Sequence, residues 1–310
     1  REAKVASPRS IHCAATLRDV VLALRGDGEW LDTSTQEKIH ASSHIADMSD
    51  VRGQPTARLA AEIAAAGSHH ILFVGSPGAG KTMIAERLPG LLPPLTNEEA
   101  VTATMIHSAA GASLPPGGLI TFPPFRAPHH SASMIAMVGG GSSVLRPGEA
   151  SLAHSGVLFL DEVGEFMPSV LDALRQPLEE GEVRIARASA GITLPARFLL
   201  VGATNPCPCG GGAPGACVCN ETARSKYLRR LSGPFLDRFD LRVAVAMTGV
   251  EELLDVREGE PSAAEQERVA RVREMSLHRS GGVNARLSAQ ELDTHAPLSP
   301  AARDVLRREL

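Results

Sequence analysis

The sequence predicts an α/β fold with a mainly parallel sheet, followed by a small helical domain. Short apolar runs that suit buried parallel strands lie at residues 71–75, 157–160, 198–202 and 241–245. Helical patterns separate these runs, and strands that alternate with helices are typical of a parallel sheet. A phosphate-binding motif follows the first run directly, which is the context that this motif requires.

Length and composition narrow the class of protein. The chain has 310 residues, enough for two domains or for one large domain with a satellite. Its 43% of hydrophobic and 21% of charged residues exclude a chain that is disordered as a whole. A net charge of -4 excludes a protein that coats nucleic acid through bulk charge, so any such contact has to be local. We find no run of about 18 apolar residues and no leader pattern, so we expect a cytoplasmic protein without a membrane partner.

The character of the chain changes near residues 50 and 247. Residues 1–50 hold one short amphipathic pattern and a polar linker, and we expect the remnant of an N-terminal domain. Residues 51–247 contain the strand runs and should form the nucleotide-binding core. Residues 248–310 read as helical. Because the chain starts at Arg1 and ends at Leu310 within a helical pattern, we expect it to be a fragment.

The segment after the first strand run carries the most specific motif, G-x-x-x-x-G-K-[ST]. Its glycines let the backbone wrap closely around phosphate oxygens. The ammonium group of Lys81 can reach the β and γ phosphates, and the hydroxyl of Thr82 can ligate Mg²⁺. We therefore expect ATP and Mg²⁺ as cofactors. The binding residues would be Gly75, Ser76, Pro77, Gly78, Ala79, Gly80, Lys81 and Thr82.

Two adjacent carboxylates follow the second strand run. Alone, Asp161 and Glu162 could belong to a solvated acidic turn. With a phosphate loop upstream, we expect Asp161 to hold Mg²⁺ through water and Glu162 to act as the general base on the attacking water.

Two polar residues flank the later strand runs. Asn205 closes the third run, where its amide can hold the lytic water against the γ-phosphate. An Asn-Pro turn is the alternative, and both can be true together. Arg238 lies just before the fourth run, where a surface ion pair with Asp237 or Asp240 would also explain it.

Four cysteines lie within 13 residues among glycines and prolines: Cys207, Cys209, Cys217 and Cys219. In a cytoplasmic chain disulfides are not expected, and four thiolates on a tight loop suit a tetrahedral Zn²⁺ site. The C-x-C spacing is less usual for zinc than C-x-x-C. A cysteine-rich loop without metal and a redox site are the alternatives.

These motifs together resemble those of AAA+ ATPases. The segment FRAPHHSAS at residues 125–133, the segment at 139–162 and Asn-Pro-Cys-Pro-Cys at 205–209 narrow the resemblance to the magnesium-chelatase-like YifB/ComM family. The best-studied members of that family are hexameric DNA branch-migration helicases. The resemblance covers about residues 51–310. It implies a P-loop AAA+ α/β/α sandwich with β-hairpin insertions and a helical lid.

The resemblance also implies roles for single residues. Arg238 would be the finger inserted into the ATP site of the neighbouring subunit, and Gln54 would lie in the segment that lines the adenine pocket. Longer members begin with a Lon-protease-like domain, of which residues 1–26 resemble the last elements. Their lid carries a sensor arginine after a Leu-Ser-x-Arg signature, which here would lie beyond Leu310.

Residues 182–194 alternate apolar and polar side chains around an Ala-Ser-Ala-Gly turn, which predicts a two-stranded hairpin. In rings of the resembled type such hairpins project into the pore. There Arg184 and Arg187 could track a DNA backbone without reading bases. A solvated hairpin that only packs on its neighbour is the alternative.

We therefore expect an ATP-hydrolysing AAA+ motor that acts on DNA. The expected partners are further copies of the chain, in a hexameric ring, and DNA held by the pore hairpins. A chelatase-type subunit that drives metal insertion by a partner is the alternative from another class. A truncated, inactive nucleotide-binding remnant is the third possibility, because turnover depends on the lid sensor.

Overall fold

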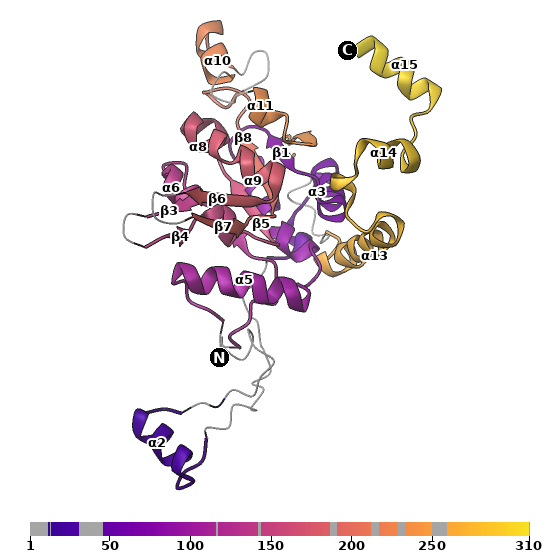
Figure 1. Ribbon diagram of the computed structural model, residues 1–310. Helices are drawn as coiled ribbons and strands as arrows, with labels where there is room; N and C mark the ends of the chain where they lie inside the picture. Colours follow the sequence, from indigo (N-terminus) through magenta and orange to yellow (C-terminus); the bar gives the residue numbers. More distant parts are fainter. Residues whose placement is uncertain are drawn as a thin grey trace. The chain divides into compact units, whose positions relative to one another are not determined.

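The computed structural model describes residues 12, 14–30, 46–115, 117–141, 144–186, 191–211, 217–228, 233–249 and 259–309. Figure 1 shows the helices and strands of the chain, coloured along the sequence. The chain divides into two compact units, each built from several segments. Unit 1 takes residues 1–45, 94–158 and 169–198, and unit 2 takes residues 46–93, 159–168 and 199–310. The domain boundaries expected near residues 50 and 247 stay predictions.

A parallel sheet forms the core, with the strand order β2-β5-β8-β1-β9. Its strands are β1 (Ile71–Val74), β2 (Phe125–Arg126), β5 (Val157–Leu160), β8 (Leu199–Thr204) and β9 (Leu241–Ala244). In unit 2, β1 pairs in parallel with β8 and with β9. In unit 1, β2 pairs in parallel with the first half of β5. The predicted α/β class is confirmed, and all four apolar runs of the sequence form strands of this sheet.

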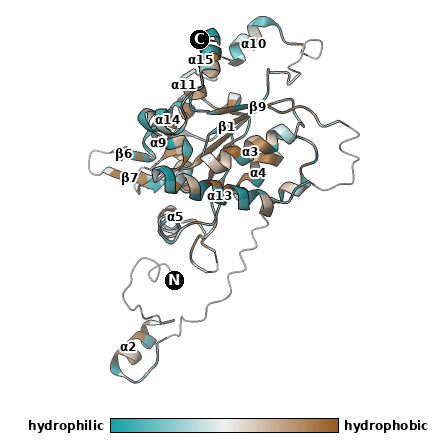
Figure 2. Cartoon of the chain, turned by 90° about the vertical axis from the view of Figure 1, so that its right-hand side faces the viewer, coloured by the Kyte–Doolittle hydropathy of each residue, from teal (hydrophilic) through white to brown (hydrophobic). Residues whose placement is uncertain are grey.

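The strands are continuous apolar runs because helices cover the sheet. Every residue of β5 and of β8 is buried, which is the pattern expected where neither face of a strand meets water. In unit 2 helix α3 (Pro55–Gly67) buries a row of alanines, and hydrophobic colouring marks both α3 and β1 in Figure 2. Small side chains let this helix lie close to its neighbours.

Helix α13 (Ser262–Ser280) packs on α3 within unit 2, and ion pairs join the two helices. Arg58 donates to Glu265 at 2.7 Å, and both side chains are buried or nearly so. Arg268 pairs with Glu62 at 2.7 Å at the same junction. Breaking a buried pair leaves an uncompensated charge, so the Arg58 pair holds α13 more firmly than an exposed pair would.

The other helices of unit 2 follow in chain order. They are η1 (Met48–Asp50), α4 (Lys81–Arg87), η2 (Leu88–Leu91), η3 (Val163–Glu165), α10 (Glu221–Leu228), α11 (Gly233–Leu236), η4 (Asn284–Arg286), α14 (Ala289–His295) and α15 (Pro300–Glu309). The helical segment predicted after the sheet is thus present as α13, α14 and α15. Within the described part of the chain, the longest helices are too short or too polar to cross a membrane.

Unit 1 contains helices and two small hairpins. The helices are α2 (Leu17–Arg25), α5 (Asn97–Ala110), α6 (Met134–Val138), α7 (Glu149–Leu152), α8 (Pro168–Ala173) and α9 (Arg175–Glu180), with the first residue of α8 in unit 2. The hairpins pair β3 (Gly139–Gly140) with β4 (Arg146–Pro147) and β6 (Glu182–Ala186) with β7 (Gly191–Pro195). The second hairpin has the two antiparallel strands that the sequence pattern predicts.

His70, which precedes β1, makes the stability of the folded chain depend on pH. Its ring Nδ1 accepts a hydrogen bond of 3.0 Å from the backbone N–H of Leu200, so this nitrogen carries no proton. Burial lowers the pKa of His70 from 6.5 to about 4, although the nearby carboxylate of Asp240 acts in the opposite direction. The unfolded chain therefore binds a proton that the folded chain does not bind, and stability is lost as pH falls below 6.5.

Between pH 7 and pH 5 we expect the free energy of unfolding to fall by about 2 kcal/mol because of His70 alone. Urea unfolding at the two pH values measures this loss. His70→Asn keeps an acceptor for the Leu200 N–H but cannot titrate, so this variant should show a loss smaller by that amount. Parallel pH dependences of wild type and variant would assign the acid sensitivity to other groups.

Candidate functional site

The phosphate loop joins β1 to α4, and its glycines are required by the backbone. A side chain at Gly75 would collide with the carbonyl oxygen of Val245. Gly78 and Gly80 have φ values of +77° and +88°, in the left-handed region that favours glycine. The loop therefore has the close wrapping that the sequence motif predicts.

Lys81 is buried at the start of α4, with 7% of its surface exposed. Its ammonium group donates to the carbonyl oxygens of Gly75 at 2.7 Å and Ser76 at 2.9 Å, and to Oδ1 of Asn205 at 3.2 Å. Burial lowers the pKa of Lys81, while the carboxylates of Asp161 and Glu162 favour its charged form. Lys81 thus joins the phosphate loop to the strand end that carries Asn205.

Thr82 and Asp161 meet directly, although 79 positions separate them in the chain. The Thr82 hydroxyl donates to Oδ2 of Asp161 at 2.9 Å. Hydroxyl and carboxylate oxygens are hard ligands of the kind that Mg²⁺ prefers. These two side chains would hold the ion that the sequence assigns to them, and a Mg²⁺ at this position would neutralise charge on bound phosphates.

Glu162 lies beside Asp161 in an unusual backbone conformation. Its φ is +51°, in the left-handed region, and its N–H donates to Oδ1 of Asp161 at 2.9 Å. Non-glycine residues rarely adopt this region, and strained positions cluster at functional sites. Glu162 is exposed to water.

Asn205 lies at the same edge of the sheet because of the strand register. Val74 of β1 is aligned with Thr204 of β8, and the N–H of Gly75 donates to the carbonyl of Thr204 at 3.2 Å. Asp161 follows β5 in the same way. The carboxyl ends of parallel strands meet at one edge, so the phosphate loop and both polar residues gather there.

Arg238 lies at the other end of the sheet. It precedes β9, whose Leu241 is aligned with Ile71 and whose Ala244 is aligned with Val74. The phosphate loop begins only after Val74, so the length of the strand, roughly 13 Å at ~3.3 Å per residue, separates the two positions. This position is consistent with an arginine that serves a site other than that of its own subunit.

Gln54 contacts the phosphate loop from the N-terminal end of α3. Its Nε2 donates to the carbonyl oxygens of Ala79, at 3.3 Å, and Ala246, and lies 3.3 Å from the Thr248 hydroxyl. The amide thereby links the loop to the segment after β9. The adenine-pocket role of Gln54 stays a prediction.

The four cysteines form one cluster, with all four Sγ atoms within 4.8 Å of one another. Cys207 is buried, Cys217 and Cys219 are partly buried and Cys209 is exposed. Hydrogen bonds from the backbone N–H groups of Gly211 and Val218 lower the pKa of Cys209 to about 6. The neighbouring Cys209 raises the pKa of Cys219 to about 12. A bound cation would stabilise several thiolates at once, so that neighbouring cysteines could all lose their protons.

Two contacts at this site had no assigned role in the sequence analysis. Tyr227 of α10 is buried, and its hydroxyl lies 3.1 Å from the hydroxyl of Thr204. The signal was available, since Tyr227 is the only tyrosine of the chain and a buried hydroxyl needs a partner. Gly210 lies against Pro77 of the phosphate loop, where a side chain would approach the proline ring to 2.5 Å. No local pattern indicates that contact.

The predicted nucleic-acid contacts lie on the β6–β7 hairpin of unit 1. Arg184 is exposed, and its guanidinium donates to Glu182 at 2.7 Å and lies 3.3 Å from Glu180. Exposed pairs of this kind are weak, so a phosphate group can replace the carboxylates at small cost. Arg187 lies outside the described residues.

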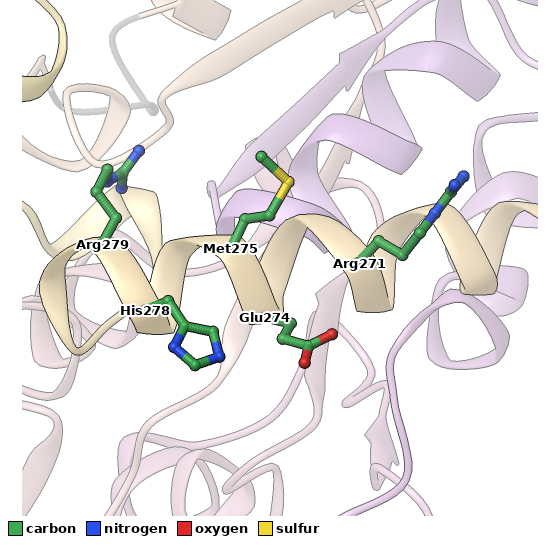
Figure 3. Close-up of a pocket in the computed structure, with 5 residues that line it drawn as sticks. All are labelled: Arg271, Glu274, Met275, His278 and Arg279. Carbon is green, nitrogen blue, oxygen red and sulfur yellow. The ribbon is translucent and has the colours of Figure 1, made fainter.

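An open hollow of about 550 Å³ lies along α13 (Figure 3). Its lining residues, all exposed, are Arg271, Glu274, Met275, His278 and Arg279. They follow the spacing of one helix face, and none of them belongs to the predicted nucleotide site. This surface therefore stands apart from the chemistry described above.

Comparison with known proteins gives several clear similarities. The family model for magnesium chelatase, subunit ChlI, matches residues 47–253. The competence protein ComM of Haemophilus influenzae is 45% identical over 309 residues, covering 96% of this chain and 59% of that protein. The YifB protein of Escherichia coli K12 is 49% identical over 249 residues, covering 79% of this chain and 48% of that protein.

Among solved structures, a model of the complex between the BchI and BchD subunits of magnesium chelatase, based on cryo-EM, is 21% identical with a TM-score of 0.47. It covers 81% of this chain and 77% of that chain. The chain spans about half the length of the curated relatives that it matches.

Proposed function

The chain belongs to the magnesium chelatase ChlI family of AAA+ ATPases, and on this premise we propose that it binds ATP with Mg²⁺ and hydrolyses it. The observation that carries the proposal is the convergence of Lys81, Thr82, Asp161 and Asn205 at one edge of a parallel sheet. Each of these side chains has the chemistry that phosphoryl transfer needs, and the hydrogen bonds of 3.2 Å and 2.9 Å join them in two pairs.

Each side chain has a separate task in this proposal. Lys81 binds the β and γ phosphates, and Thr82 and Asp161 hold the Mg²⁺ that neutralises their charge. Glu162 takes a proton from the attacking water, since its exposed carboxylate follows Asp161 directly. Asn205 orients that water while its Oδ1 remains within hydrogen-bond reach of Lys81.

We also propose that the active form is a homo-oligomeric ring, hexameric by analogy with the resembled family. Arg238 would complete the ATP site of the adjacent subunit, because the strand register places it away from its own phosphate loop. Because the site would then need an arginine from a second copy, we expect the isolated chain to hydrolyse ATP slowly.

For the coupled work we propose remodelling or branch migration of DNA. The similarity to the competence protein ComM supports this assignment, and Arg184 and Arg187 on the hairpin would contact the phosphate backbone. The second candidate is a chelatase-type subunit that drives metal insertion by a partner, which the name of the matching family favours.

We further propose that the four cysteines bind one Zn²⁺, because their sulfur atoms form a single compact cluster.

ATP turnover with and without branched or single-stranded DNA tests the proposal. We expect turnover that DNA stimulates. Turnover without stimulation would favour the chelatase-type function, and binding without turnover would favour an inactive remnant.

Lys81→Ala should weaken ATP binding by about 30-fold or more, because truncating a buried charged hydrogen-bonding group costs at least about 2 kcal/mol. Lys226→Ala on α10 is the matched control and should bind ATP normally. Equal affinities of the two variants would refute the nucleotide site.

A further inference from the structure

We propose that the metal-bound cysteine cluster positions the nucleotide site, by fixing Asn205 and the Pro77 side of the phosphate loop. Loss of the metal would then weaken ATP binding and slow turnover. The inference rests on the proposed ATPase function and on the proposed zinc site, and adds a coupling between them.

The sulfur atoms have the spacing of ligands around one ion. Cys207 lies 3.4 Å from Cys209 and 3.6 Å from Cys217, and Cys209 lies 3.8 Å from Cys217. Four thiolates at a Zn–S distance of ~2.3 Å form a tetrahedron with edges of about 3.8 Å. Small shifts of the side chains would therefore complete the coordination of a single Zn²⁺.

The first ligand is tied to Asn205 through the backbone. Cys207 is only 1% exposed and follows Asn205 by two residues. Only Pro206, whose ring restricts the backbone, separates them. A metal that holds Cys207 in place therefore also limits where the Asn205 amide can point, and that amide accepts the hydrogen bond from Lys81.

The loop between the ligands touches the phosphate loop itself. Gly210 follows the second ligand and packs so closely against Pro77 that a side chain there would come within 2.5 Å of the proline ring. The Gly210 N–H donates to the carbonyl of Cys207 at 3.0 Å, so the first ligand also sets the position of Gly210. The cysteine loop thus supports the phosphate loop from outside.

The chain that leaves the cluster returns to the same edge of the sheet. Tyr227 contacts the hydroxyl of Thr204, next to Asn205, and its ring lies against Gly164. Gly164 follows Glu162 by two residues. An ion that cross-links a loop anchored at both ends removes many of its conformations, and this loop has both ends beside groups of the nucleotide site.

The test compares wild type with Cys209→Ser, Cys209→His and Val218→Ser. Cys209 is exposed, so its replacement leaves the core intact, while Val218 is 87% exposed between two ligands and is no ligand itself. The readouts are zinc per chain by elemental analysis, affinity for a non-hydrolysable ATP analogue, and kcat and KM. In a second experiment, a chelator removes zinc from wild type under reducing conditions, and either Zn²⁺ or Mg²⁺ alone is then added.

We expect about one zinc per chain in wild type, Val218→Ser and Cys209→His, and almost none in Cys209→Ser. Cys209→Ser should bind the analogue more weakly and lose about 100-fold in kcat, which is the effect of displacing a group at the reaction centre by ~1 Å. Chelation should reproduce both losses, and Zn²⁺ but not Mg²⁺ should reverse them. If Cys209→Ser fails to fold, the chelation experiment on wild type tests the inference instead.

Two results would overturn the inference in different ways. Wild type without zinc, or with another metal in its place, would remove the zinc site. Zinc that is lost while affinity and kcat stay unchanged would leave the cluster a local structural site with no positioning role. Either result leaves the ATPase proposal standing, because wild-type turnover and the Lys81→Ala variant test that proposal separately.

Discussion

Replacing Arg238 by alanine is expected to lower ATP turnover by about 10³ to 10⁵, which is the contribution of arginine fingers in other nucleotide hydrolases. ATP affinity of the isolated chain should stay nearly unchanged. The physical reason is the position of Arg238 before β9, a full strand length from its own phosphate loop. In the proposed ring, its charge would stabilise the transition state across an interface with another copy.

Steady-state turnover and nucleotide titration measure the two quantities. Arg242→Ala is the matched control, because Arg242 follows four residues later, is 51% exposed and pairs with Asp237. This variant should retain turnover. A loss of ATP affinity in isolated Arg238→Ala chains would contradict the position inferred from the strand register.

Mixing two inactive variants sharpens the test. Arg238→Ala lacks the finger and Lys81→Ala lacks the phosphate-binding ammonium, so each alone should be inactive. A mixed ring contains interfaces that pair an intact phosphate loop with an intact finger, and part of the turnover should return. If sizing shows co-assembly and the mixture stays inactive, Arg238 acts within its own subunit or only structurally.

Glu162→Gln is expected to bind ATP and to lose turnover by about 10² to 10⁴, the usual contribution of a general base. The amide keeps the shape of the side chain but cannot accept the proton of the attacking water. Because ATP then persists at the subunit interface, the proposed ring should also dissociate less. Single-turnover hydrolysis and sizing in the presence of ATP measure these effects.

Glu165→Gln is the control for the Glu162 variant. Glu165 is an exposed carboxylate three residues later, at the end of η3, and has no assigned role. Its replacement should leave turnover at the wild-type rate. Hydrolysis by Glu162→Gln at the parental rate would show that another group, or water alone, takes the proton.

The residues of the proposed nucleotide site could be named from the sequence because its parts are local. The phosphate loop needs glycines at fixed positions, and Gly78 and Gly80 adopt the backbone angles that only such residues favour. Asp161 and Asn205 follow apolar runs, and the ends of parallel strands meet at one edge. Strand β2 was not predicted as a strand, because two residues are too few to show a period.

Contacts between distant segments had no comparable signal. The bond between Lys81 and Asn205 joins residues 124 positions apart, and Gly210 reaches Pro77 across a similar interval. Neither contact follows from residue type, since each depends on how two loops lie after the strands have paired. The acidic partners of Arg184 could have been suspected, because Glu180 and Glu182 lie at helix and strand spacings from it.

The amino-acid sequence predicts the class of fold, which the structure confirms, and it names the residues of the proposed nucleotide site. Both depend on residue type and short spacing, which a single pass along the chain reveals. Two relations became visible in the folded chain alone: the phosphate loop contacts the cysteine loop through Pro77 and Gly210, and Arg238 precedes β9 at the end of the strand away from the phosphate loop. Those relations arise from the order and register of the strands, which are set when segments far apart in the chain pair and exclude water together.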